Sequence, residues 1–222
     1  RSPETNAMLA ATSEGVDEGR RRKALQWGTA AAASALVTPS LVRAEAPYKR
    51  TLKMQSLNSG EKLTITYWAD GAYLKDALPR INWFMRDLRA HESFEMDVRL
   101  LDLLWEIDRH TRSRNPLYTM SGYRSPETNA MLAATSEGVD EASFHMRGMA
   151  MDLTQDFRDP EALFLVAKKL GRGGAGFYPT KRPFVHVDVG PKDLWRWPEK
   201  PREGRAADFD RSDAETAAKA KS

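Results

Sequence analysis

The chain has 222 residues, of which 41% are hydrophobic, a composition typical of a soluble globular protein that excludes one with many membrane spans. It contains no cysteine, which excludes disulfides, thiolate zinc sites and a cysteine nucleophile. Without cysteine, any metal site must be built from histidine, aspartate and glutamate, and there are only four histidines. The net charge is +3.

The first residues of the chain recur unchanged further along it. Residues 1–18, RSPETNAMLAATSEGVDE, are identical to residues 124–141. A repeat protein shows three or more diverged units at a regular period, and here two identical copies stand 123 residues apart. We therefore interpret residues 1–19 as a duplicated arm, either an artefact or disordered, and exclude it from the predicted fold.

Residues 20–44 have the order of an export signal. Consecutive arginines from Arg20 precede an alanine-rich apolar run over 27–37, and small residues follow, ending at Ala44. The run is shorter than the ~20 residues that span a membrane. Paired arginines before a weakly apolar segment favour the twin-arginine route. We expect cleavage after Ala44, no stable membrane insertion afterwards, and a location in the periplasm or cell envelope; an uncleaved anchor or amphipathic arm is the alternative.

This signal accounts for part of the positive charge. Six of the 34 Lys and Arg and four of the 31 Asp and Glu lie in residues 1–44, which leaves a net charge of +1 on the rest. Residues 48–198 contain no basic stripe with interleaved aromatic residues. We therefore expect no nucleic-acid partner.

The globular domain is expected over residues 48–198, followed by a charged, disordered tail over 199–222. Period-two and helical patterns alternate along it, and a turn over 58–61 joins the first two strands as a hairpin. This mixture predicts an α+β domain with a small, mostly antiparallel sheet packed with helices. The predicted strands are 51–57, 62–68, 118–122, 149–153, 174–178 and 184–189. The predicted helices are 73–89, with a start near Pro79, 97–111, 126–135 and 160–170, and the last segment, 195–198, closes the fold.

Two of the four histidines lie near aspartates. His145 precedes the predicted strand that contains Asp152, and Gly148 between them permits a sharp turn. His186 lies in the last predicted strand. Two histidines and one aspartate leave a fourth position for water, as in catalytic zinc sites. Taken singly, each histidine is more often a hydrogen-bonded residue than a ligand, and we treat His91 and His110 in that way.

Strand alternation separates the residues around His186 into two faces. Val185 and Val187 point to one face and suit the core. His186 and Asp188, together with Phe184, point to the other face, which we expect to border a cleft.

Three motifs, in this order along the chain, resemble those of a known superfamily. They are Ser121-Gly122-Tyr123-Arg124-Ser125, then Ser143-x-His145-x-x-Gly148-x-Ala150-x-Asp152, then His186-x-Asp188. With the export signal and the glycine-rich stretch from Gly173, they are similar to the zinc peptidases of the D-Ala-D-Ala carboxypeptidase and murein endopeptidase superfamily, and most of all to its murein endopeptidase K-like members. The resemblance implies a hedgehog/DD-peptidase-like fold and, as substrate, the peptide stems of peptidoglycan.

The resemblance also assigns roles to individual residues. His145, Asp152 and His186 would be the ligands of a zinc ion, Zn²⁺. Arg124 matches an arginine that faces the active site, where a guanidinium group holds a substrate carboxylate or the oxyanion. A surface salt bridge is the alternative for Arg124.

The general base is less clear from the motifs. Many relatives place a glutamate three residues before the last histidine ligand or a histidine two before it, and here those positions hold Pro183 and Phe184. Asp188 is our candidate base. Its alternative role is to orient a ligand ring through a hydrogen bond.

The resemblance therefore implies an exported, monomeric zinc metallopeptidase that cleaves peptide cross-links in peptidoglycan. One alternative is a carboxypeptidase of the D-Ala-D-Ala type. Because the usual base positions are not occupied by titratable residues, a non-catalytic peptidoglycan-binding module on the same fold is a further alternative.

Overall fold

The computed structural model describes residues 48–155 and 159–199. The predicted duplicated arm, the export signal and the tail from residue 200 onward lie outside the described residues. Within the described ranges, no helix is both long enough and apolar enough to cross a membrane.

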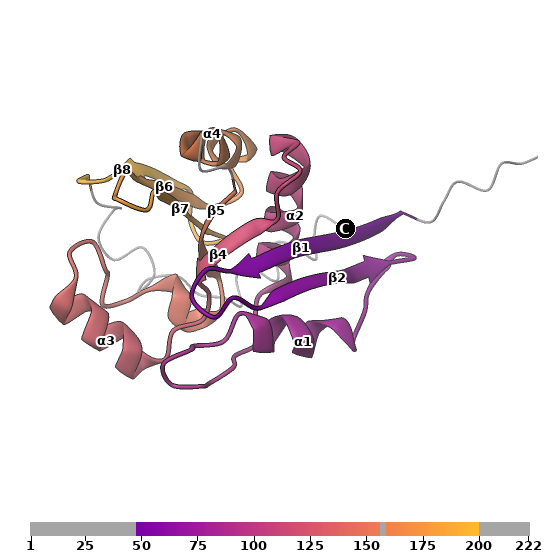
Figure 1. Ribbon diagram of the computed structural model, residues 1–222, viewed down its shortest axis with the longest axis horizontal. Coiled ribbons are helices and arrows are strands. Elements are labelled where there is room, and N and C mark those ends of the chain that lie inside the picture. Colours follow the sequence, from indigo (N-terminus) through magenta and orange to yellow (C-terminus); the bar gives the residue numbers. More distant parts are fainter. Residues whose placement is uncertain (1–47, 156–158, 200–222) are drawn as a thin grey trace, which may run out of the picture. The chain divides into compact units, whose positions relative to one another are not determined.

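An eight-stranded sheet forms the centre of the domain, in the order β3-β2-β1-β4-β5-β7-β6-β8 (Figure 1). The pairs β1–β4 and β6–β8 are parallel, and the other neighbouring pairs are antiparallel. The mostly antiparallel α+β class predicted from the sequence is confirmed. The strands are β1 (Lys49–Ser56), β2 (Lys62–Ala69), β3 (Ala72–Tyr73), β4 (Leu117–Ser121), β5 (Ala150–Thr154), β6 (Gly174–Tyr178), β7 (Phe184–Asp188) and β8 (Asp193–Arg196).

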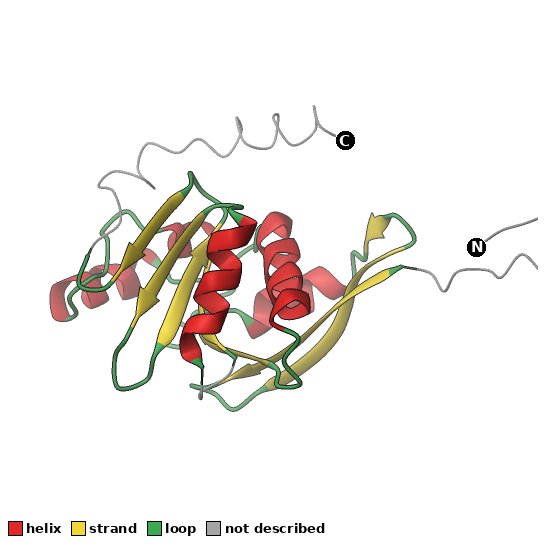
Figure 2. Cartoon of the chain, turned by 90° about the horizontal axis from the view of Figure 1, so that it is seen from above, coloured by secondary structure: helices red, strands yellow, loops and turns green. Residues whose placement is uncertain are grey.

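Helices pack on the face of the sheet that carries the hydrophobic core. Two of them, α2 and α4, lie side by side there, with α2 against β1 and α4 against β6 and β7, and α1 packs against β2 (Figures 1 and 2). The side chains of Asp97, Ser125 and Asp159 cap the first turns of α2, α3 and α4 by accepting backbone N–H bonds. The helices are α1 (Ala77–Phe84), α2 (Val98–Thr111), α3 (Pro126–Thr135) and α4 (Pro160–Leu170), with a 3₁₀ helix, η1 (Phe144–Arg147).

Alternation along β7 separates the core from a second, functional face. Val185 and Val187 are 0% exposed and belong to the hydrophobic core. In the antiparallel pairing of β5 with β7, Asp152 lies opposite His186. Because directly paired residues project to the same face of a sheet, Asp152 and His186 share the face away from the two valines.

Most of the predicted elements are confirmed to within about two residues, and two differ. The helix predicted over 73–89 begins at Ala77, close to the start expected near Pro79, and β3 occupies the first residue of the pattern; α1 ends at Phe84, five residues earlier than predicted. The strand β8, which pairs in parallel with β6, begins two residues before the segment that was expected only to close the fold and includes its first two residues. Four residues are too few to show an alternation in sequence, although exposed Leu194 and buried Trp195 do alternate in the structure.

The turn before β5 requires a glycine. Gly148 ends η1 with φ of 64°, and an added Cβ atom would lie 2.4 Å from the backbone oxygen of Glu95. Both the left-handed conformation and this close approach disfavour a side chain. The turn that was predicted from Gly148 is therefore present, and it sets the direction in which η1 presents His145.

We expect Gly148→Ala to lower the free energy of unfolding by more than about 2 kcal/mol, since it adds a clash to the strain of a left-handed residue. Urea denaturation measures this loss. Gly171→Ala is the matched control, because Gly171 has φ of 58° but its added Cβ would lie 3.7 Å from the nearest atom. That control should lose about 1 kcal/mol, and equal losses in the two variants would contradict the steric argument.

Candidate metal centre and its cavity

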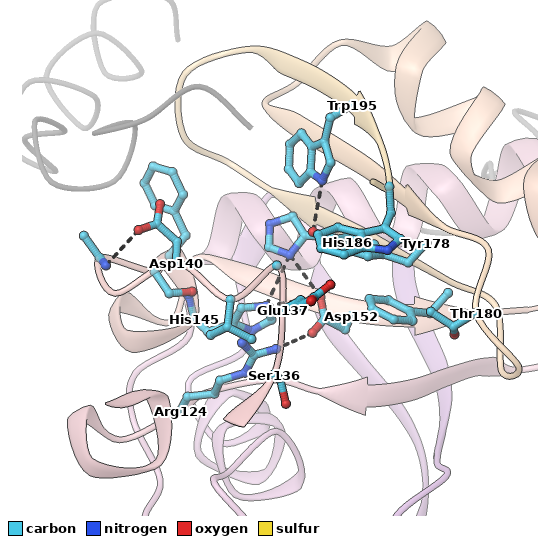
Figure 3. A pocket seen from close by; sticks show the side chains of 17 residues that line it. Arg124, Ser136, Glu137, Asp140, His145, Asp152, Tyr178, Thr180, His186 and Trp195 are labelled. Atoms are coloured by element: carbon cyan, nitrogen blue, oxygen red, sulfur yellow. Dashed lines mark hydrogen bonds and ion pairs between the residues drawn. The ribbon is translucent and has the colours of Figure 1, made fainter. Parts of the chain in front are cut away.

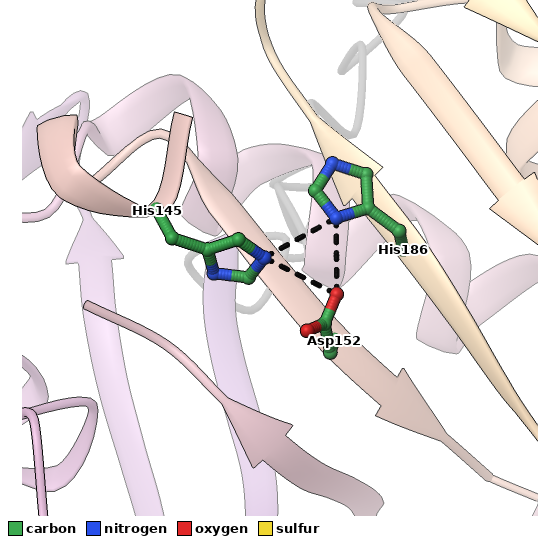
Figure 4. Close-up of side chains that lie close together, drawn as sticks. All are labelled: His145, Asp152 and His186. Atoms are coloured by element: carbon green, nitrogen blue, oxygen red, sulfur yellow. Dashed lines mark hydrogen bonds and ion pairs between the residues drawn. The ribbon is translucent and has the colours of Figure 1, made fainter. Parts of the chain in front are cut away.

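Three ligand atoms from three separate elements meet at one point (Figure 4). His145 comes from η1, Asp152 from β5 and His186 from β7. The Oδ1 atom of Asp152 lies 3.2 Å from Nε2 of His145 and 3.0 Å from Nδ1 of His186. The two imidazole nitrogens are 3.2 Å apart. The structure thus brings together the three residues that the motifs single out as ligands.

The outer nitrogen of each imidazole has an acceptor of its own. Nδ1 of His145 lies 2.7 Å from the carbonyl oxygen of Gly122, and Nε2 of His186 lies 3.2 Å from Oδ2 of Asp188. A carbonyl or carboxylate oxygen accepts a hydrogen bond, so we assign the ring hydrogen to these outer nitrogens. When both rings are neutral, Nε2 of His145 and Nδ1 of His186 turn their lone pairs toward each other and toward Asp152.

This donor set fits a zinc-type divalent cation. Histidine and carboxylate ligands lie about 2.0–2.1 Å from zinc in tetrahedral sites, which puts neighbouring ligand atoms about 3.3 Å apart. The separations of 3.0–3.2 Å among the three atoms are close to that value. Two lone pairs and a carboxylate oxygen at such distances repel one another unless a cation lies between them.

The electrostatic surroundings keep His145 neutral and Asp152 ionised, which are the states that bind metal, whereas His186 must give up a proton when a metal binds. Burial and the charge of Arg124 lower the pKa of His145 to about 4. Burial also acts to lower the pKa of His186, but its hydrogen bonds to Asp152 and Asp188 outweigh burial and raise the pKa to about 9. Burial acts to raise the pKa of Asp152, but the neighbouring positive charges hold it well below its usual range. Asp152 is therefore a carboxylate at neutral pH.

Asp188 does not border the cleft as the strand alternation predicted. Its side chain is 0% exposed. Its Oδ1 accepts the backbone N–H groups of Gly174 at 3.0 Å and Gly190 at 2.8 Å, and its Oδ2 meets the outer nitrogen of His186. Backbone from both neighbouring loops covers this carboxylate and holds it behind the ring. This geometry suits the orientation of His186 better than proton transfer with a water molecule at the ligand atoms.

Arg124 contacts the carboxylate of Asp152 at Oδ2, the oxygen that does not face the two histidines. Its Nη2 forms an ion pair with Oδ2 of Asp152, and its Nε donates to Oγ of Ser121 at 2.8 Å. The Arg124 side chain is 12% exposed and lines the cavity next to the ligands. The salt bridge considered for Arg124 therefore exists, but it lies in the site rather than on the open surface.

A cavity of about 450 Å³ opens over the three ligand atoms. Aromatic side chains form one wall of the cavity. The loop that follows α3 contributes further lining residues, which include the carboxylates of Glu137 and Asp140 (Figure 3). The loop meets this wall at Gly138, where φ is 83° and an added Cβ atom would lie 2.6 Å from the ring of Trp197. The aromatic wall consists of Tyr178, Phe184, Trp195 and Trp197.

Sequence reasoning missed most of these lining residues. Trp195 and Trp197 were expected only to close the fold, and Glu137 and Asp140 stand in no motif. The signal that could have found them is the strand face shared by Phe184 and His186, which marks the neighbouring side chains on that face as candidates. The other two histidines, His91 and His110, are exposed and lie outside the ligand cluster.

The contact between Asp188 and His186 predicts the effect of one substitution on metal binding. Asp188→Asn keeps the volume but loses the charged acceptor for the ring N–H, so zinc affinity should fall about 10- to 100-fold. Competition with a chromophoric chelator measures it. Asp102→Asn is a matched control, because Asp102 is a carboxylate that accepts from Tyr67 and Tyr73 outside the cavity. A zinc affinity unchanged by Asp188→Asn would contradict the orienting role.

Comparison with known proteins agrees with the motifs and the geometry. Residues 44–195 match the family described as peptidoglycan L,D-endopeptidase MepK. The Escherichia coli K12 protein of that name is 34% identical over 179 residues, which cover 81% of this chain and 98% of that protein, and the Shigella flexneri protein matches equally. A probable peptidoglycan L,D-endopeptidase MepK of Haemophilus influenzae is 31% identical over 182 residues, covering 82% and 97%. No solved structure matches the chain. The chain belongs to the peptidoglycan L,D-endopeptidase MepK family, within the murein endopeptidases of the zinc peptidase superfamily that its motifs resemble.

Proposed function

We propose that this protein is an exported zinc metallopeptidase that cleaves peptide cross-links in peptidoglycan. The observation that carries the proposal is the convergence of two imidazole nitrogens and a carboxylate oxygen at the base of an open cavity. The relatives are named peptidoglycan L,D-endopeptidases, which supports the same reaction here. Among cross-links, that name favours the bond between two diaminopimelates, since it joins an L centre to a D centre.

In this proposal His145, Asp152 and His186 hold the metal. A bound zinc ion supplies a water of lowered pKa and polarises the scissile carbonyl group. The chain's own groups keep the ligands aligned: the Gly122 carbonyl and Asp188 fix the two rings, and Arg124 fixes the carboxylate. The guanidinium of Arg124 also places a positive charge at the cavity wall, where negative charge develops on the substrate.

The proton of the attacking water needs an acceptor on the cavity side of the ligands. Asp188 was our candidate from the sequence, and its burial behind His186 supports an orienting role in its place. The loop after α3 brings the carboxylates of Glu137 and Asp140 to the cavity. We propose that the base is one of these two, since general-base catalysis requires a carboxylate within reach of the water.

The remaining parts of the proposal rest on the sequence. The basic and apolar order of residues 20–44 supports export by the twin-arginine route to the periplasm or cell envelope, where peptidoglycan lies. The motifs support a hedgehog/DD-peptidase-like arrangement of the domain. We propose that the protein acts as a monomer.

A digest of muropeptides tests the reaction. The zinc-loaded protein should convert dimers joined through two diaminopimelates into monomers, and His186→Ala should lose this activity. Release of terminal D-Ala without cleavage of dimers would show a carboxypeptidase. Binding to sacculi with an unchanged muropeptide profile would show a non-catalytic module, and either result would overturn the proposal.

Arg124→Ala tests the charge at the cavity wall separately from metal content. The substitution removes the partner of Asp152 and a positive charge beside the reacting carbonyl, so we expect turnover at saturating zinc to fall about 100-fold. Steady-state rates on the same dimers measure the loss, with zinc content determined in parallel. Full turnover at saturating zinc would contradict a catalytic role for Arg124.

A further inference from the structure

One row of residues crosses four strands on the face that carries the ligands. Asp152 on β5 pairs with His186 on β7, His186 pairs with Gly176 on β6, and Gly176 pairs with Trp195 on β8. Residues in register across neighbouring strands project to the same face. The row therefore contains the two candidate ligands Asp152 and His186, then Gly176, which has no side chain, and finally the indole of Trp195.

The missing side chain at Gly176 lets the indole reach the site. An added Cβ atom on Gly176 would lie 2.1 Å from Cε2 of Trp195, so the indole occupies the space above this glycine. The ring centroids of Trp195 and His186 are 5.4 Å apart. Trp195 is thus a neighbour of a ligand, although β6 separates their two strands.

The indole holds a tyrosine hydroxyl in a defined orientation. Nε1 of Trp195 donates to the hydroxyl oxygen of Tyr178 at 3.0 Å. An indole N–H is a donor only, so the Tyr178 oxygen is the acceptor and its own hydrogen is left for another partner. Among residues 48–155 and 159–199 the structure gives this hydrogen no acceptor. Tyr178, Trp195 and His186 all line the cavity, and Figure 3 shows the hydroxyl of Tyr178 at the indole N–H of Trp195.

The ring of Tyr178 is fixed as well. It stacks on Phe184 with centroids 4.5 Å apart and planes 5° apart, and it also stacks on Trp197 at 6.1 Å. Burial raises the pKa of Tyr178 to about 12, so the hydroxyl keeps its proton at neutral pH. A fixed, protonated donor at the wall of a metal-site cavity is the kind of group that stabilises developing negative charge.

We propose that Tyr178 is a catalytic residue, whose hydroxyl donates a hydrogen bond to the scissile carbonyl oxygen as that oxygen becomes negatively charged, and that Trp195 is the positioning residue that aims it. The O–H bond stays intact, so no further reactant is needed. The inference rests on the proposed peptidase function. Packing alone does not explain this hydroxyl, because phenylalanine would stack equally well on Phe184 and Trp197, whereas the hydroxyl is oriented by the indole at the cavity wall.

Tyr178→Phe tests the catalytic role because it removes the hydroxyl and keeps the stacked ring. We expect kcat for dimer cleavage to fall about 100-fold with little change in KM, zinc content or unfolding midpoint. Tyr73→Phe is the matched control, since it removes a hydroxyl that donates to Asp102 at 2.8 Å outside the cavity, and its kcat should be unchanged. An undiminished kcat in Tyr178→Phe would overturn the inference. Absence of cleavage by the unmodified protein would instead overturn the proposed function.

Binding of a phosphinate analogue of the cross-link gives a second readout that needs no turnover. Its tetrahedral phosphinyl oxygen imitates the charged carbonyl oxygen, so Tyr178→Phe should weaken its affinity by a factor similar to the loss of kcat. An affinity unchanged by the substitution would count against the hydrogen bond.

A double-mutant cycle tests the positioning role of Trp195. Trp195→Phe removes the N–H that orients the hydroxyl, so it should lower kcat in the unmodified background and have no further effect in the Tyr178→Phe background. Equal effects of Trp195→Phe in both backgrounds would show that Trp195 acts independently of the hydroxyl and would overturn its positioning role.

Discussion

The arrangement of the site depends on one constraint: two histidine lone pairs and a carboxylate oxygen lie within 3.2 Å of one another. Such a cluster is unfavourable by itself and becomes favourable around a cation. Two features of the fold bring these atoms together: the register of one pair of strands and one turn. The pairing of β5 with β7 places Asp152 beside His186, and the left-handed turn at Gly148 brings η1 and His145 over the end of β5.

Each ligand is held by a second group on its outer side. The Gly122 carbonyl fixes His145, Asp188 fixes His186, and Arg124 fixes Asp152. These contacts decide which nitrogen of each ring faces inward, and they balance the buried charges in pairs. The groups that hold the ligands come from elements on both sides of the site, so the geometry of the metal centre is tied to the fold as a whole.

Part of this could be predicted from the sequence, and the rest depends on pairing between distant strands. Local patterns predicted the hairpin and the helices α2, α3 and α4, because helical period and turn residues are encoded within a few residues. The motifs predicted the three ligand residues, and the structure brings them together. The burial of Asp188 was not predicted, because strand alternation gives the face of a residue but says nothing of the loops that cover it. The contact between Trp195 and His186 could not be predicted from local patterns either, because it requires the parallel pairing of β8 with β6 and the absence of a side chain at Gly176.

We propose that His145, Asp152 and His186 bind one metal ion through the nitrogens and the oxygen that converge in the structure. X-ray absorption at the zinc K edge tests this most directly, on the purified protein loaded with one equivalent of zinc. We expect one tightly held zinc ion per chain with nitrogen and oxygen ligands in fourfold coordination, two of the ligands being imidazoles. A protein that retains no zinc, or a spectrum without imidazole scattering, would contradict it.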